Sequence, residues 1–205
     1  MSHLQTLHYL PCIAWFQHIA NAPDFVLEKQ DNYNKQTYRN RCKILAANGV
    51  LDLIVPVKKN NTSDLYIDLE LENDFNWKKQ HWQSIQSAYG KSAFFEFYED
   101  RFSRLYLHSQ HSHLYAFNLD LIQLLLRSLK LDSKIGFSTA YEINPENAID
   151  LRTSFSPKNK NSETELLRPI AYWQVFEDKF GKTHNLSIID LLFNAGPESI
   201  AILRK

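Results

Sequence analysis

The spacing of apolar residues changes along the chain, from strand-like in the first quarter to helical after it. Apolar runs at 6–10 and 25–27 predict two short strands, the first stopped by Pro11. Between them, the large apolar residues of 13–20 recur at helical spacing. A strand, a helix and a strand in this order favour a parallel pair joined by a right-handed crossover.

A β-hairpin is predicted next. Asn48-Gly49, a dipeptide typical of tight hairpin turns, lies between two strand-like runs. The apolar residues of the second run alternate, which predicts a single apolar face made by Leu51, Leu53, Val55 and Val57.

From Phe75 onward the spacing predicts three helices. The first has an apolar face made by Trp77, His81, Ile85 and Ala88, with Trp82 and Tyr89 beside it. The second has Phe94, Phe97, Tyr98, Phe102 and Leu105 on one side. The third, from Leu114 to Lys130, is apolar except for one narrow polar stripe, so we expect it to be the central buried helix.

The rest of the chain mixes a strand, a polar stretch and two short helices. A strand is predicted over 137–142, a polar loop over 144–168, a helix over 187–194 and a last helix ending near Leu203. The sequence thus predicts one α/β domain over 1–205, with a short parallel βαβ start, a β-hairpin and a mainly helical second half. The α/β half covers about 1–70 and the helical half about 75–205.

Composition narrows the possible functions. The chain has 205 residues, 44% of them hydrophobic, which is enough for a folded core. Because 23 Lys and Arg balance 23 Asp and Glu, we expect no nucleic-acid partner. We expect no membrane span, since no apolar run reaches the roughly 18 residues required. The start lacks signal-peptide features and the two cysteines, Cys12 and Cys42, have no metal or redox spacing, so a cytoplasmic location is expected.

Against this neutral background, basic residues gather around the predicted hairpin. Because Arg39, Arg41 and Lys43 alternate, they lie on one face of an extended strand. Lys58 and Lys59 end the partner strand, and Lys35 lies upstream. Arginine pairs bind phosphate bidentately. The row therefore predicts a site for an anionic small molecule, such as a nucleotide sugar or a phosphorylated donor. The alternative is a solvated strand face whose lysines protect an edge.

Two residues are candidates for proton transfer. Asp31 lies with Asn32 in the polar loop 28–35, which follows a strand of the predicted parallel pair, where ligands of such sheets bind. The loop is equally well explained as a polar turn. His81 lies on the apolar side of its helix, where it is either a general base at a pocket or a hydrogen-bonded core residue.

Further candidates have structural alternatives. Gln174 is an amide in an apolar stretch that we expect to be a helix, and it must bond to a ligand or to the backbone. Asp190 follows Ser187 in a capping-box pattern, or its carboxylate faces a cleft. The run His108, His111 and His113 lacks a nearby carboxylate or cysteine, so we expect no metal site. Core packing is the favoured role of both cysteines, and no glycine-rich phosphate loop or other cofactor motif is present, so the cofactor is left open.

Four blocks resemble the WbqC-like protein family. They are 8–16 (HYLPCIAWF), 39–59 with its Asn48-Gly49 and VPVKK, the segment 81–89, and the closing segments 172–176 and 185–197. Ala14 and Trp15 stand where we expect a glycine in the first block. Tyr9, in that block, is a further candidate for ligand binding.

The resemblance implies a bacterial protein of O-antigen or other surface-polysaccharide biosynthesis, with amino-acyl or glycyl transfer to a sugar as a suggested activity. We therefore expect a transferase. The alternatives are a non-catalytic binding or assembly protein of the same pathway, and a simple nucleotide-binding domain with its ligand near 11–16.

Overall fold

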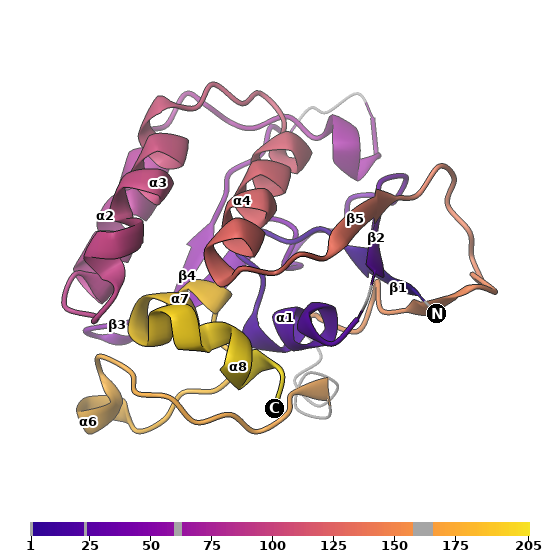
Figure 1. Ribbon diagram of the computed structural model, residues 1–205. Coiled ribbons are helices and arrows are strands. Elements are labelled where there is room, and N and C mark those ends of the chain that lie inside the picture. The colour runs from indigo at the N-terminus through magenta and orange to yellow at the C-terminus, as the bar shows by residue number, and fades with distance from the viewer. Residues whose placement is uncertain (1, 23, 60–62, 158–165) are drawn as a thin grey trace.

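The computed structural model describes residues 2–22, 24–59, 63–157 and 166–205. A four-stranded parallel sheet has the order β5-β2-β1-β6, formed by β1 (Ser2–Thr6), β2 (Asp24–Glu28), β5 (Lys134–Phe137) and β6 (Ala148–Asp150) (Figure 1). In chain order this is third, second, first, fourth, as at the start of a doubly wound sheet. The predicted βαβ start is confirmed, because α1 (Ile13–Ala20) joins the parallel pair β1 and β2.

Different elements cover the two faces of this sheet. On one face lies α1, whose Trp15 ring is 6.1 Å from Phe25 of β2. On the other face Leu4 and Val26 line a cavity together with residues of the segment 138–147, which connects β5 to β6. We call this segment the crossover segment. It makes a wide excursion away from the helices before it returns to β6 (Figure 1).

Two predicted strands are shifted. The first ends at Thr6 rather than Leu10, because the chain turns there: Leu10 has a φ of 41°, and Tyr9 N–H donates to the Tyr38 carbonyl at 2.9 Å. The apolar residues of 7–10 are therefore buried in a turn. The strand predicted over 137–142 lies at Lys134–Phe137 instead. The sequence analysis missed β6, which has only 3 residues and no apolar period.

The hairpin is confirmed as β3 (Arg41–Ala46) paired with β4 (Gly49–Ile54). Gly49 has a φ of 108°, a conformation that favours glycine. The predicted apolar face is present only in part, because Leu53 and Val55 are buried whereas Leu51 is 38% exposed.

The three long helices are α2 (Trp77–Tyr89), α3 (Phe95–His108) and α4 (Leu114–Leu129). All six side chains predicted for the inner face of α2 are buried, and α4 is buried along most of its length, as expected. The face predicted for α3 is wrong at Phe97, which is 65% exposed. The buried stripe of α3 consists of Phe95, Tyr98, Phe102 and Tyr106.

Short elements complete the fold: η1 (Tyr66–Asp68), α6 (Glu177–Phe180), α7 (Ile188–Ala195), η2 (Gly196–Glu198) and α8 (Ser199–Leu203). The predicted polar loop 144–168 contains β6 and buries Leu151, Arg152 and Phe155, while its residues 158–165 lie outside the described ranges. Within those ranges, no helix is both long and apolar enough to cross a membrane.

Gly196 ends α7 against the ring of Phe94. Its φ is 52°, and a Cβ added there would lie 2.4 Å from two ring carbons of Phe94. Gly181 has a similar φ of 69° but nothing within 4 Å of an added Cβ. Both substitutions by alanine strain the backbone, and G196A also overpacks the core.

We predict that G196A lowers the free energy of unfolding by about 1–3 kcal/mol more than G181A does, which is the usual cost of overpacking. Urea denaturation of the two variants and the wild type measures the difference. Equal losses in the two variants would contradict the packing of Gly196 on Phe94.

Candidate functional site

The carboxyl ends of the four parallel strands bring charged and hydroxyl side chains together. Thr6 ends β1, Glu28 ends β2, Asp150 ends β6, and Ser138 follows β5. Open α/β sheets bind ligands just outside this edge. We call it the carboxyl edge.

Arg152 is the residue that connects this edge. Its Nη1 donates to the Glu28 carboxylate at 3.1 Å, and its Nη2 donates to Asp150 at 2.7 Å. Nη2 also lies 2.7 Å from the carbonyl of Glu142, and the guanidinium lies 4.4 Å from the Tyr141 ring centroid. The Arg152 hydrogen bonds lower the pKa of Asp150. One buried side chain thus ties β2 and β6 to the crossover segment.

Glu28 has a structural role at this edge. It is fully buried, and its carboxylate accepts hydrogen bonds from Arg152, from the Ser138 hydroxyl and from the backbone N–H of Gln30. A buried carboxylate without such partners would cost several kcal/mol, so these bonds account for its burial.

Asp31 and Arg39, both predicted to be functional, form a second buried ion pair. The Thr6 hydroxyl lies 3.5 Å from the Asp31 carboxylate and 3.2 Å from the Arg152 carbonyl, so it connects the two ion pairs. The backbone of Arg39 is held as well, because its carbonyl accepts from Asn118 at 2.7 Å. Both residues are therefore engaged with protein partners.

His8 lies close to this pair. It is buried between Trp15 and Tyr38, and its Nδ1 has no hydrogen-bond partner among the described residues. Burial and the charge of Arg39 lower the pKa of His8 to about 3, so the imidazole is neutral.

His81, the other candidate for proton transfer, lies in the core between α2 and the hairpin. Its Nδ1 is 2.8 Å from the hydroxyl of Tyr9, which is 2.6 Å from that of Tyr106. The ring also hydrogen-bonds the Ile54 carbonyl, to which it must donate, so Nδ1 accepts from Tyr9. Burial lowers the pKa of His81 to about 4. With both nitrogens bonded, the geometry favours the core role for His81 and Tyr9.

The basic row predicted around the hairpin is divided among several partners. Arg39 pairs with Asp31, and Lys58 is 2.6 Å from Glu70. Lys43 lies 5.9 Å from the Tyr38 ring centroid. Half-buried Arg41 has a buried Nε without a hydrogen-bond partner among the described residues. Lys35, Lys58 and Lys59 are the exposed lysines of the row, and Asn32, the candidate from the loop 28–35, is exposed as well.

Gln174 and Asp190 were selected separately, and the fold brings them together. Gln174 Nε2 donates to the Asp190 carboxylate at 3.2 Å, and the hydroxyls of Tyr172 and Tyr89 donate to it at 2.8 and 3.0 Å. Burial raises the pKa of Asp190. Gln174 is not helical, contrary to expectation. The capping box does not form either, because the Ser187 hydroxyl donates to the Leu10 carbonyl at 2.9 Å.

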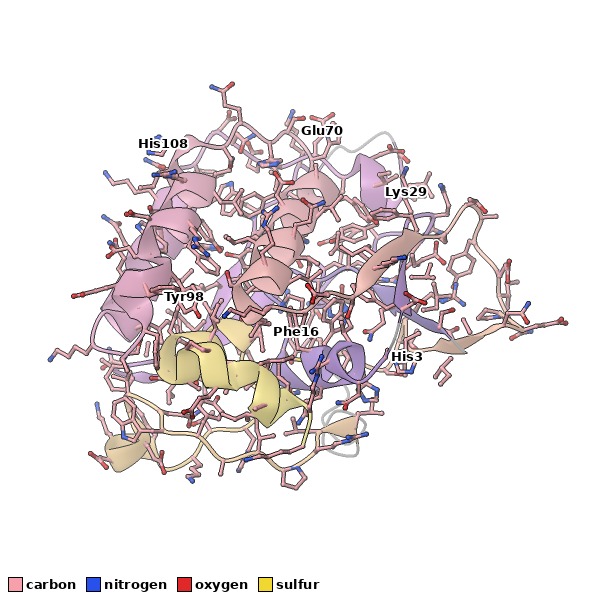
Figure 2. All side chains as sticks on the ribbon, viewed as in Figure 1. His3, Phe16, Lys29, Glu70, Tyr98 and His108 are labelled. Atoms are coloured by element: carbon pink, nitrogen blue, oxygen red, sulfur yellow. The ribbon has the colours of Figure 1, made fainter. Side chains whose placement is uncertain are left out.

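Two cavities open beside the carboxyl edge. The larger, of about 480 Å³, lies between the ends of β2 and β5, η1 and the start of α4; its walls include Lys29, Phe137, Asp68, His113, Tyr115 and Leu119. Figure 2 labels Lys29 near the end of β5. We call this larger cavity the η1–α4 cavity.

Tyr115 and His113 are polar side chains of the η1–α4 cavity whose hydrogen-bonding groups are not all used by the described residues. Tyr115 is buried, and its hydroxyl has no partner among the described residues. Burial and the charge of Glu28 raise the pKa of Tyr115, so this hydroxyl stays protonated. His113 uses Nδ1 to contact the Ser112 hydroxyl at 2.9 Å, which leaves its Nε2 for another partner.

The smaller cavity, of about 250 Å³, lies under the crossover segment. Its polar walls include Glu28, Ser138, Glu142 and Asn147, and Phe137 lines both cavities. We call this smaller cavity the crossover cavity. The backbone N–H of Lys29, which lines the η1–α4 cavity, donates to the hydroxyl of Ser138, which lines the crossover cavity, at 2.8 Å.

Other sequence candidates do not build a site. His111 Nε2 is 2.8 Å from Asp120, and across the described ranges no three His, Cys, Asp or Glu residues are placed to hold a metal ion. Cys12 and Cys42 are buried, as expected for core residues, and burial raises the pKa of Cys42.

The sequence analysis missed Arg152 and Tyr115. Arg152 lies in a polar stretch without periodicity, so no sequence signal separated it from solvated neighbours. Tyr115 is one of many large residues in an apolar helix. Glu28 and Lys29 were inside the predicted loop 28–35, and a charged pair directly after a buried strand was the available signal.

We predict that the free energy of unfolding falls as the pH drops below 6.5. His8 and His81 have lowered pKa values in the folded protein, so between those values and 6.5 they bind protons only in the unfolded chain. Each contributes about 1.4 kcal/mol per pH unit between its ordinary and its folded pKa. H81Q keeps a donor and an acceptor but cannot titrate. Between pH 7 and pH 5, the free energy of unfolding of H81Q should therefore fall by about 2 kcal/mol less than that of the wild type.

Urea denaturation across this pH range is the measurement, with H184Q at an exposed position as the control. Parallel pH curves for the wild type and H81Q would contradict a neutral, buried His81.

Comparison with known proteins places this fold in a family. An uncharacterised protein of Mycobacterium tuberculosis, Rv1507c, is 27% identical over 136 residues, which is 66% of this chain and 59% of that protein. The chain thus spans less than two thirds of this relative's length. No solved structure matches the sequence. The model of the WbqC-like protein family matches residues 7–159, which include α1, the hairpin and the carboxyl edge except for Thr6. The chain belongs to the WbqC-like protein family.

Proposed function

We propose that the protein is a transferase that moves a group between a phosphorylated or nucleotide-linked donor and a sugar, in surface-polysaccharide biosynthesis. The pathway and the acyl- or glycyl-type chemistry come from the family resemblance. The observation that carries the proposal is the pair of cavities with different linings on either side of Phe137 at the carboxyl edge. A two-substrate reaction requires two such neighbouring sites.

The η1–α4 cavity suits the donor. Apolar walls from Leu119 and Phe137 fit a base or other flat group, and Lys29 supplies a positive charge for a phosphate. The unpartnered hydroxyl of Tyr115 offers a hydrogen bond that the protein does not use. His113, with Nε2 available, is the group we assign to proton transfer.

The crossover cavity suits a neutral sugar. Glu142 and Asn147 can accept hydrogen bonds from hydroxyl groups, and no lysine or arginine is among the described residues that line it. A lining of carboxylates and amides without a cation favours a polyhydroxyl ligand over a phosphate.

The structure changes how the sequence-based hypothesis must be tested. In that hypothesis Arg39, Arg41, Lys58 and Lys59 bind the donor phosphate. R39A would leave Asp31 as a buried, unpaired carboxylate and destabilise the fold by about 3–5 kcal/mol, so its loss of binding would be uninformative. Arg41 tests the basic row without breaking an ion pair, because no salt bridge joins it to a described carboxylate.

A non-catalytic docking function remains the second candidate, because β4 exposes apolar side chains. Val50 is 54% and Ile54 is 47% exposed, and β4 pairs only with β3 among the described strands. Such an edge can accept a partner strand.

We predict that a nucleotide sugar or a related phosphorylated donor raises the melting temperature, and that K29A abolishes the rise. Saturating ligand at 100 times Kd stabilises a protein by about 2.7 kcal/mol, enough to detect in a thermal-shift assay. R41A and the exposed control K134A should keep the wild-type response.

Loss of the response in R41A, with K29A unaffected, would move the donor to the basic row and contradict its placement in the η1–α4 cavity. No response to any donor would contradict the transferase proposal. The docking function would then be tested with V50K, which should abolish capture of a partner.

A further inference from the structure

The exposed surface of α3 separates its charges into two stripes. Phe97, Arg101, Arg104 and His108 recur at spacings of four, three and four residues, which places them along one face of the helix. Glu96 and Asp100 lie on the neighbouring face, and all of these side chains are exposed. Figure 2 labels His108 at the end of α3.

The basic stripe lines a groove between α3 and α4. Arg127 of α4 faces Arg101 and Arg104 across a hollow of about 390 Å³, with the half-buried Leu105 and the buried Leu124 also lining it. None of the residues lining this groove lines either cavity at the carboxyl edge. The groove is therefore a separate site.

The three arginines of the groove have no carboxylate partner in the described ranges. Asp100 and Arg104 have the four-residue spacing of a helical ion pair, yet no salt bridge joins them. Asp120, which also lines the groove, is 2.8 Å from His111. Like charges placed together repel each other by about 1 kcal/mol per pair at 4 Å in water. An anion bound between these arginines would remove this repulsion.

The side chains define the class of that anion. Guanidinium groups bind phosphate oxygens bidentately, and three of them from two helices suit a multiply charged group better than a single carboxylate. Leu105 and Leu124 provide an apolar surface beside the charges for the rest of an ester. We propose that the α3–α4 groove binds a diphosphate or another multiply charged phosphate ester through Arg101, Arg104 and Arg127. This site does not depend on the proposed transferase function.

Calorimetric titration of the full chain with inorganic diphosphate tests the site. R104A/R127A should bind at least about tenfold more weakly than the wild type, because two charge-assisted contacts are lost. The matched control K79A/K91A removes two exposed positive charges from α2 and the segment after it, and it should bind like the wild type. Circular dichroism checks that both variants keep the fold, as expected for exposed positions.

Cosedimentation distinguishes a free phosphate ester from a lipid headgroup. Vesicles of phosphatidylcholine and phosphatidic acid in equal parts, which present a phosphate monoester, are compared with vesicles of phosphatidylcholine alone. If the wild type and K79A/K91A bind the anionic vesicles and R104A/R127A does not, the phosphate belongs to a lipid headgroup. Diphosphate binding without vesicle binding would assign it to a soluble ester. Equal weakening in both variants, or no binding of diphosphate or vesicles, would overturn the proposal.

Discussion

The buried contact of Arg152 with Glu28 is the interaction on which the carboxyl edge depends. Backbone pairing alone gives β6 a weak attachment, because it has 3 residues and lies at the edge of the sheet beside β1. Arg152 adds charged hydrogen bonds to β2, to Asp150 at the end of β6 and to the crossover segment. Removing one partner of such a buried pair usually costs about 3–5 kcal/mol, so the sheet edge and the crossover segment are held together.

This contact also determines the shape of the candidate site. Glu28 is held by Arg152 and Ser138, and the next residue, Lys29, is thereby directed to the η1–α4 cavity while the crossover cavity stays on the other side. The Thr6 hydroxyl extends the network to Asp31 and Arg39. Asp31 and Arg39, which the sequence suggested as functional, are therefore engaged with each other, and the polar side chains that line the η1–α4 cavity include Lys29, His113 and Tyr115.

Periodic patterns predicted the parts of the fold that depend on neighbouring residues. The helices α1, α2 and α4, the hairpin and the parallel βαβ start follow from apolar spacing and from Asn48-Gly49. The first strand was misplaced because the buried residues of 7–10 form a turn, and β6 was missed because three residues carry no period. Both errors arise where tertiary contacts, rather than local pattern, decide the backbone.

The fold shows which of the sequence candidates lie together and which protein partners they have. The carboxyl edge was predicted from the parallel pair, and Gln174 and Asp190, selected independently, are hydrogen-bonded to each other. Alternation placed Arg39 and Arg41 on one face, but Arg39 precedes β3 and turns to Asp31. The pattern of one sequence does not show which residues distant along the chain pair with each other, as Arg152 does with Glu28. Such partners can be identified only from the folded structure.

Hydrogen exchange of the double variant E28Q/R152M tests the central role of this contact most directly. It removes both charges together, so no buried charge remains unpaired. We expect faster exchange at the amides of β6, Ser138 and Leu151, with α4 exchanging as in the wild type. Wild-type exchange rates at β6 in this variant would contradict the account, because pairing with β1 alone would then hold the carboxyl edge.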